Sequence, residues 1–292
     1  MNERTGLLYA LAAALLFGVS GAVAADTFQS LDPLRVAQLR SVLAALALGA
    51  VAYRRRRTAH GGKLLHLAFF GSLLAAVTIT YYWAIDRLGV GPGVTLQFIG
   101  PVFVLAWMRV VQRRRVGGAA WVAAAIAVSG IALVTQAWDL KELDLLGILA
   151  GLGAAVSLAA YLLVGEHLGR SMTALAMTAY GFAFSSVILL LAVPFRIPDV
   201  GGVVWGQIVW IALAGTAIPF LLEIAAVKRA DPGRVGVVAT SEPVIATATA
   251  WIALGQALSL VQIVGAALVI AGVATVQAMT HSVAPEVPPS VV

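Results

Sequence analysis

The 292-residue chain contains no cysteine, and only 11% of its residues are charged. Without cysteine, neither disulfides nor thiolate metal sites can form. Because an ordinary soluble domain has about 25% charged residues, this low share, together with 61% hydrophobic residues, indicates an integral membrane protein. The net charge of +6 does not predict a nucleic-acid partner, since the basic residues fall in short runs between apolar segments, as membrane topology requires.

Enzyme signatures are also missing from the sequence. Neither His-Glu-x-x-His nor Gly-x-Ser-x-Gly occurs. The four histidines, His60, His66, His167 and His281, are expected in loops, at a helix start or in the tail. We therefore expect a protein that is not an enzyme and that holds neither a metal ion nor a cofactor.

Ten apolar runs are long enough to cross about 30 Å of hydrocarbon, which takes about 20 helical residues. They are 6–25, 34–53, 64–85, 90–111, 119–137, 145–165, 171–193, 203–227, 235–254 and 258–279. The first run ends in Ala22–Ala25, which resembles a signal-peptidase site. Its apolar core is longer than the usual signal core of about 7–15 residues, so we expect a retained helix.

The second half of the chain repeats the first at a spacing of 142 residues. The matches at this spacing that are least expected by chance in so apolar a chain are Arg87 with Arg229, Gly91 with Gly233, Pro101 with Pro243 and Gly130 with Gly272. Each repeat holds five runs, and because five is odd the second must enter the membrane from the opposite side. We expect a first repeat over 1–137, an outer loop over 138–144, a second repeat over 145–279 and a disordered cytoplasmic tail over 280–292.

Inverted repeats are typical of transporters, whose substrate site lies near the midplane where the halves meet. The positive-inside rule places both termini in the cytoplasm, with the run Arg54–Arg57 as a topology anchor. We expect a multi-pass protein of the inner membrane, a monomer or weak homodimer. Its expected partners are membrane lipids and a small-molecule substrate.

Two carboxylates, Glu242 and Glu223, lie inside apolar runs. A central ionisable group costs about 2.5–3.5 kcal/mol on insertion scales and marks a functional site by default. We expect both to bind a proton or a substrate amine. The alternative is that each pairs permanently with a basic or hydroxyl group and only holds helices together.

Residues seven apart share a helix face, and this spacing, with the repeat, selects companions for the carboxylates. Tyr81, for example, stands at the repeat position of Glu223. The full set expected for substrate binding or proton coupling is Glu242, Glu223, Gln97, Tyr81, Tyr82, Thr78, Tyr161, Ser157, Thr216, Ser241, Thr249, Phe98 and Arg40. Arg40 either snorkels to headgroups or pairs with an acidic group.

Three prolines, Pro101, Pro243 and Pro219, are expected to break helices beside these residues. Proline removes a backbone hydrogen bond, and backbone freed in this way is tolerated where it is buried in protein or lines a water-filled cavity. Simple packing kinks are the alternative.

At these residues the chain resembles the EamA-domain branch of the drug/metabolite transporter superfamily, in particular the bacterial threonine/homoserine exporters. The matching positions are Arg40, 96–101, 219–223 with Ala226, 241–243 and 254–255. The resemblance implies ten helices in two inverted repeats and export of amino acids by alternating access. Two positions depart from the exporters' pattern: Gln256 stands where they usually have Glu, and Gln97 where they can have Glu.

The residues leave other functions open. The cargo could instead be a nucleobase, a sugar or a cationic drug. A second alternative is a membrane sensor or scaffold that transports nothing, although the loops are too short to hold a soluble domain.

Overall fold

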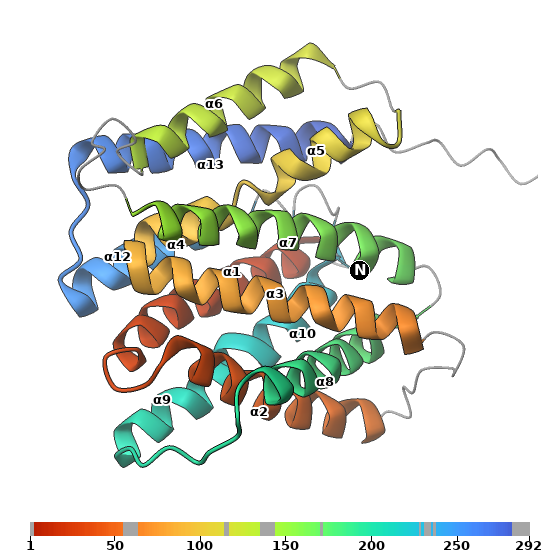
Figure 1. The fold of residues 1–292 in the computed structure, drawn as a ribbon. Helices are drawn as coiled ribbons and strands as arrows, with labels where there is room; N and C mark the ends of the chain where they lie inside the picture. The colour runs from red at the N-terminus through yellow and green to blue at the C-terminus, as the bar shows by residue number, and fades with distance from the viewer. Residues whose placement is uncertain are drawn as a thin grey trace, which may run out of the picture.

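The structure is a computed structural model that describes residues 3–54, 64–113, 117–134, 144–169, 172–227, 229–230, 235 and 238–281. All regular elements in these residues are helices, as the sequence predicts (Figure 1). They are α1 (Glu3–Thr27), α2 (Pro33–Arg54), α3 (Leu64–Leu88), α4 (Val90–Gln97), α5 (Gly100–Val110), α6 (Gly118–Val134), α7 (Leu145–Gly169), α8 (Ala174–Ala192), α9 (Gly202–Ala212), the π-helical η2 (Leu213–Ala217), α10 (Ile218–Val227), α12 (Glu242–Leu254) and α13 (Leu260–His281).

Seven helices within the described residues are long and apolar enough to cross a membrane. Two of these spans are composite, because one joins α4 to α5 and the other joins α9, η2 and α10. Three shorter apolar helices cover Trp121–Val134, Glu242–Leu254 and Leu260–Thr275. Each of the ten predicted runs therefore contains helix, whereas the number that crosses the membrane stays a prediction.

Three runs that the sequence predicts as single helices are interrupted. The run 90–111 is divided between α4 and α5, and the run 203–227 contains the π-helical η2. In the run 235–254, α12 begins only at Glu242. Hydrophobic length alone cannot reveal such interruptions, because the apolar pattern continues through them.

The three predicted helix-breaking prolines share one position, the second residue of a helical segment. Pro101 is second in α5, Pro219 in α10 and Pro243 in α12. Pro101 and Pro243 stand in the first turn of a helix that follows a break, so each loses no intrahelical bond, since that N–H would have no partner anyway. Pro219 follows η2 without a break, so it removes one backbone donor from a continuous helical span. The chain bends just before Pro101 and Pro243, where short i to i+3 bonds such as Val102 N–H to the Ile99 carbonyl (2.8 Å) replace the α-helical ladder.

The helices α6 and α13 pack closely through glycines that correspond in the two halves. A Cβ atom on Gly130 would lie 2.6 Å from the carbonyl oxygen of Gly265 and 2.8 Å from Val269. A Cβ atom on Gly272 would lie 2.5 Å from the carbonyl oxygen of Ala123 and 2.7 Å from the backbone nitrogen of Ala127. The two helices run antiparallel, because the later residue of α6 meets the earlier residue of α13 (Figure 1).

The starts of α1 and α7 also make corresponding contacts, each with the other half of the chain. A Cβ on Gly6 would touch the backbone of Arg229 and Ala230, and a Cβ on Gly147 would touch Arg87 and Leu88. Arg87 and Leu88 stand 142 positions before Arg229 and Ala230. Each half therefore supplies a helix start that packs on the other half's helix end.

Most of the larger helix contacts join one half of the chain to the other. Helix α1 packs on α12 and α10, α3 on α7 and α8, and α2 on α8. Buried side chains such as Tyr82 and Ile211 form a core cluster with residues of α1 and α2. Residues 282–292 of the predicted tail, residues 138–143 of the predicted outer loop and most residues of the basic runs lie outside the described residues, whereas residues 280–281 belong to α13.

Candidate functional site: an interior polar cluster

Arg40 points from α2 toward the middle of the helix bundle. Its Nε donates to Thr216 Oγ1 at 2.6 Å, and its Nη1 donates to the Tyr82 hydroxyl at 3.2 Å. The guanidinium also lies 5.4 Å from the centre of the Tyr82 ring, within cation–π range. The sequence left two roles open for Arg40, contact with headgroups or pairing with an acidic group. The structure shows hydrogen bonds from Arg40 to two hydroxyls inside the protein.

The partner of Arg40 on η2 is held by the π-helical turn. Thr216 donates its hydroxyl to the carbonyl of Ile211, five residues earlier, at 2.8 Å. The wider turn therefore lets the fully buried Thr216 hydroxyl bond its own backbone and accept from Arg40 at once. Single π turns inside α-helices often occur at functional sites.

Two adjacent tyrosines of α3 form the aromatic side of the cluster. Tyr82 is buried and packs edge-on against Phe28, with ring centres 5.1 Å apart. Tyr81 lies 5.8 Å from Tyr82 and is only half-buried. A Cβ on Gly21 of α1 would lie 3.2 Å from the Tyr81 hydroxyl, so the absence of a side chain there leaves room for that hydroxyl.

Glu242 is the first residue of α12, where the helix dipole favours a negative charge. Its carboxylate is close enough to Glu223 and Arg40 for charge–charge interaction, and Tyr81 lies within the same range. Helix α1 reaches this point through Gly18, whose Cβ would lie 3.0 Å from the Glu242 carbonyl oxygen. The structure thus brings together Glu242, Glu223, Arg40 and Tyr81.

Glu223 lies on α10 and faces a second aromatic group. Tyr161 of α7 is close enough to Glu223 for electrostatic interaction. The Tyr161 ring stacks on Phe70 with centres 4.6 Å apart, which fixes its position. Phe220, one turn before Glu223, packs edge-on against Phe17 and Phe182.

No hydrogen bond joins the carboxylate of Glu242 or Glu223 to a described residue, in contrast to the bonds that link Arg40 with Thr216 and Tyr82. Both side chains are only half-buried, and neither appears among the buried atoms that lack a partner. Gln97, the last residue of α4, shares these properties. The three side chains therefore retain free hydrogen-bonding capacity and are partly accessible to solvent.

Several predicted site residues instead donate their side-chain hydroxyl to a backbone carbonyl three or four residues earlier. Thr78 Oγ1 donates to the Leu74 carbonyl at 2.9 Å, and Thr249 Oγ1 donates to the Ile245 carbonyl at 2.8 Å. Ser241 Oγ donates to the Val238 carbonyl at 2.8 Å. Such bonds occupy the donor of each hydroxyl and leave only its acceptor capacity for a ligand.

Two further predicted residues lie apart from these contacts. Phe98 stands at the break between α4 and α5 and packs against a core cluster that includes Val94 and Ala246. Ser157 is half-buried on α7, and within the described residues no hydrogen bond joins it to Arg40 or the carboxylates.

Sequence reasoning missed two polar links between the halves. Gln207 of α9 donates from Nε2 to Asp26 at 2.6 Å, and Thr27 donates to Gln207 Oε1 at 3.3 Å. Gln256 accepts from the backbone N–H of Val90, the first residue of α4, at 3.0 Å. The signal available in the sequence was the presence of single polar residues in or beside apolar runs.

The EamA-like transporter family matches the chain twice, over residues 4–136 and 145–277. The threonine/homoserine exporter RhtA of Salmonella typhimurium strain SL1344 is 29% identical over 218 residues, which cover 71% of this chain and 69% of the exporter. RhtA of Escherichia coli strain K12 is 28% identical over the same shares. The uncharacterised transporter YwfM of Bacillus subtilis is 23% identical over 93% of each chain.

A solved crystal structure has the same fold, with a TM-score of 0.67 and 18% identity. The superposition covers 93% of this chain and 96% of the other. The two family matches together extend over most of the sequence. The chain is therefore a membrane transporter that belongs to the EamA-like transporter family.

Proposed function

We propose that this transporter exports amino acids or similar small polar metabolites by alternating access, and that the cargo binds at the interior polar cluster. The observation that carries the proposal is the pairing of opposite charges there. Arg40 offers a guanidinium and Glu242 a carboxylate, and the two lie within charge–charge range. An α-amino acid carries the complementary charges, a carboxylate and an ammonium group.

In this proposal the substrate carboxylate binds Arg40 and the substrate ammonium binds Glu242. A guanidinium has five donors, and the structure uses Nε and Nη1 for Thr216 and Tyr82, which orients the remaining donors. The Glu242 carboxylate has no described hydrogen-bond partner that a ligand would have to displace. The Tyr81 and Gln97 side chains would contact the rest of the cargo.

Coupling to protons is assigned to the same carboxylates. A carboxyl group without a protein partner, at a depth where water is scarce, can bind a proton in one access state and release it in the other. Glu223 is the second candidate, because it interacts electrostatically with Glu242. Proton uptake by one would then weaken the repulsion felt by the other.

The architecture proposed for alternating access has ten membrane-crossing segments in two inverted five-helix repeats. Three observations support it: seven long apolar helices with three shorter ones, the antiparallel contact of α6 with α13, and the corresponding contacts of Gly6 and Gly147. Inverted repeats bind substrate at the interface between the halves. The protein would lie in the inner membrane with both termini in the cytoplasm.

Counterflow in proteoliposomes tests the function. Vesicles loaded with unlabelled threonine should accumulate labelled threonine or homoserine, and a pH gradient should change the rate. Agmatine and nucleobases serve as parallel probes of other cargo. A site that selects only cations would favour agmatine over threonine. If no amino acid, amine or nucleobase exchanged in either gradient direction, transport of this kind would be excluded and a sensor or scaffold would be favoured.

A further inference from the structure

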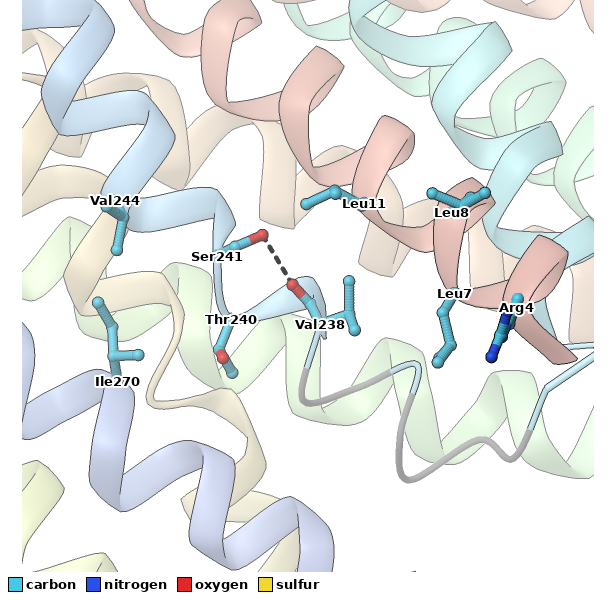
Figure 2. Close-up of a pocket in the computed structure, with 9 residues that line it drawn as sticks. All are labelled: Arg4, Leu7, Leu8, Leu11, Val238, Thr240, Ser241, Val244 and Ile270. Atoms are coloured by element: carbon cyan, nitrogen blue, oxygen red, sulfur yellow. Dashed lines mark hydrogen bonds between the residues drawn. The ribbon is translucent and has the colours of Figure 1, made fainter.

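A groove of about 750 Å³ opens on the outside of the bundle, between α1 and the segments that contain α12 and α13 (Figure 2). Its lining residues are Arg4, Leu7, Leu8, Leu11, Val238, Thr240, Ser241, Val244 and Ile270. In Figure 2, Arg4 lies at one end, and Val244 and Ile270 lie at the other. Volumes of about 300–1,000 Å³ are usual for sites that hold small molecules.

We propose that this groove binds one acyl chain of an anionic phospholipid, with the phosphate at Arg4. The four α1 residues, Arg4, Leu7, Leu8 and Leu11, follow the three- and four-residue spacing of a single helix face. From Arg4 to Leu11 this face runs about 10 Å along the helix. Arg4 begins the span Arg4–Thr27, so it lies at the level where lipid headgroups meet the hydrocarbon.

The lining favours an apolar occupant over a polar solute. Six of its side chains are Leu, Val or Ile, and Leu8 and Val244 are 63% and 54% exposed. The Ser241 hydroxyl, which could have recruited a polar ligand, already donates to the Val238 carbonyl. Because these helices are membrane-spanning segments or apolar helices beside them, the bilayer itself supplies the occupant.

The charge at the end of the groove selects the headgroup. Arg4 is the one ionisable residue in the lining, and its guanidinium has enough donors to hold a phosphate oxygen in addition to a protein contact. Arginine near a membrane surface attracts anionic lipids. A phosphatidylglycerol-type headgroup therefore fits better than a zwitterionic one of the same chain length.

The groove also joins the two halves of the chain, since α1 belongs to the first half and the other lining segments to the second. Ser241 directly precedes Glu242, and Gly18 of α1, about two turns beyond Leu11, packs against the Glu242 backbone. A lipid held here would contact both sides of this junction and hold them together.

The test uses the full chain, purified in neutral detergent and delipidated. Binding of palmitoyl-oleoyl phosphatidylglycerol and of the matching phosphatidylcholine is measured by native mass spectrometry, together with the shift in melting temperature. One added cation near the surface contributes about 1 kcal/mol, so phosphatidylglycerol should bind about fivefold more tightly. Equal binding of the two lipids by the wild-type protein would overturn the proposal.

Two variants and a matched control separate this groove from lipid bound elsewhere on the surface. Arg4→Gln should abolish the preference for phosphatidylglycerol, whereas Arg109→Gln, which removes an exposed cation of α5, should leave it unchanged. Val244→Trp should fill the groove and weaken binding of both lipids. If Val244→Trp does not fold, Arg4→Gln decides alone, and an unchanged preference in that variant refutes the site.

Discussion

Arg40 of α2 donates a 2.6 Å hydrogen bond to Thr216 in the π-helical turn η2, and so links the first half of the chain to the second inside the bundle. The Thr216 hydroxyl in turn donates a hydrogen bond to the Ile211 carbonyl at 2.8 Å. Arg40 is therefore positioned by groups of both halves.

Arg40→Lys should impair transport although it retains the positive charge. Lysine has no planar fork, so it cannot reproduce the Nε and Nη1 bonds together and also present a donor pair to a carboxylate. Losing one hydrogen bond to a charged group costs about 1.5–3 kcal/mol, which predicts a rise in KM for threonine of about tenfold or more. Threonine counterflow measures it.

The matched control for this variant is Arg109→Gln, at an exposed position in the last turn of α5. The melting temperatures of both variants should be similar. A lower melting temperature of Arg40→Lys would mean that a folding defect could explain its rise in KM. A KM for Arg40→Lys equal to that of the wild-type protein would contradict binding of the substrate carboxylate by Arg40.

Glu242→Gln should weaken or abolish the pH dependence of transport. The amide has nearly the same shape but cannot bind and release a proton in this range. The measurement is the counterflow rate across a pH series, compared with the same series for Glu223→Gln. An unchanged profile in Glu242→Gln would return this residue to a structural role, and loss of the profile only in Glu223→Gln would assign coupling to α10.

Gly130→Ala and Gly272→Ala should each lower the thermal stability by a similar amount. A Cβ on either residue would lie within 2.8 Å of at least two atoms of the facing helix, so the backbones must separate. Such overpacking costs about 1–3 kcal/mol. Gly206→Ala is the matched control: no atom lies within 4 Å of its added Cβ, and alanine favours helix by about 1 kcal/mol.

Thermal unfolding in one detergent gives the comparison for these three variants. The Gly206→Ala melting temperature should be equal to or above that of the wild-type protein. Unequal effects of Gly130→Ala and Gly272→Ala, with one of them neutral, would argue against a shared, reciprocal contact.

Asp144→Ala should destabilise the protein by about 1 kcal/mol, the usual cost of losing an N-cap. Asp144 Oδ1 accepts from Gly147 N–H at 2.8 Å and from Arg87 Nε at 3.1 Å. The bond from Gly147, followed by the contact with Arg87, holds the Asp144 pKa below its ordinary value of 3.8. A lowered folded pKa stabilises the folded state above the unfolded pKa.

That contribution is lost as the pH falls through the folded pKa. The difference in unfolding free energy between the wild-type protein and Asp144→Ala should therefore be full at neutral pH and shrink below about pH 4. Asp144→Asn, which keeps a cap acceptor but loses the charge, should show a smaller deficit at neutral pH, and this deficit should disappear at low pH, where wild-type Asp144 has lost its charge as well. A difference for Asp144→Ala that stays constant across this range would show that the charge contributes nothing.

Gln256→Ala should loosen the start of α4, whereas Gln256→Glu should not. The side-chain carbonyl of Gln256 accepts from Val90 N–H, and a carboxylate can accept the same bond. Removing the acceptor leaves a partly buried N–H without its partner, at a cost of about 1–3 kcal/mol. Hydrogen exchange of the Val90 amide is the direct readout, and slow exchange retained in Gln256→Ala would contradict the cap.

The helical class, the approximate position of each helix and the family could be predicted from the sequence, because hydrophobic length and repeated Arg, Gly and Pro residues carry that information. The pairing of Arg40 with Thr216 could not, since it depends on a π-helical turn that shifts the register of η2 by one residue. Helical spacing aligned Thr216 with Glu223 and gave no reason to look toward α2.

The carboxylates could be singled out from their burial cost alone, and the structure places Glu242 and Glu223 near each other. Arg40, which interacts with Glu242, was selected from the sequence with an open role. By contrast, the donors of Thr78 and Thr249 bond their own helices, a choice that depends on side-chain rotamers. Sequence spacing reports the face of a helix and not the rotamer of a hydroxyl.

The reciprocal glycine contact between α6 and α13 bears on the proposed alternating access. If the two halves interchange their conformations during a cycle, Gly130 against Val269 becomes Gly272 against Ala127, and the interface is mapped onto itself. Under the proposed alternating access, this helix pair would then keep the same set of contacts in both access states, and the rearrangement would fall on the other helices.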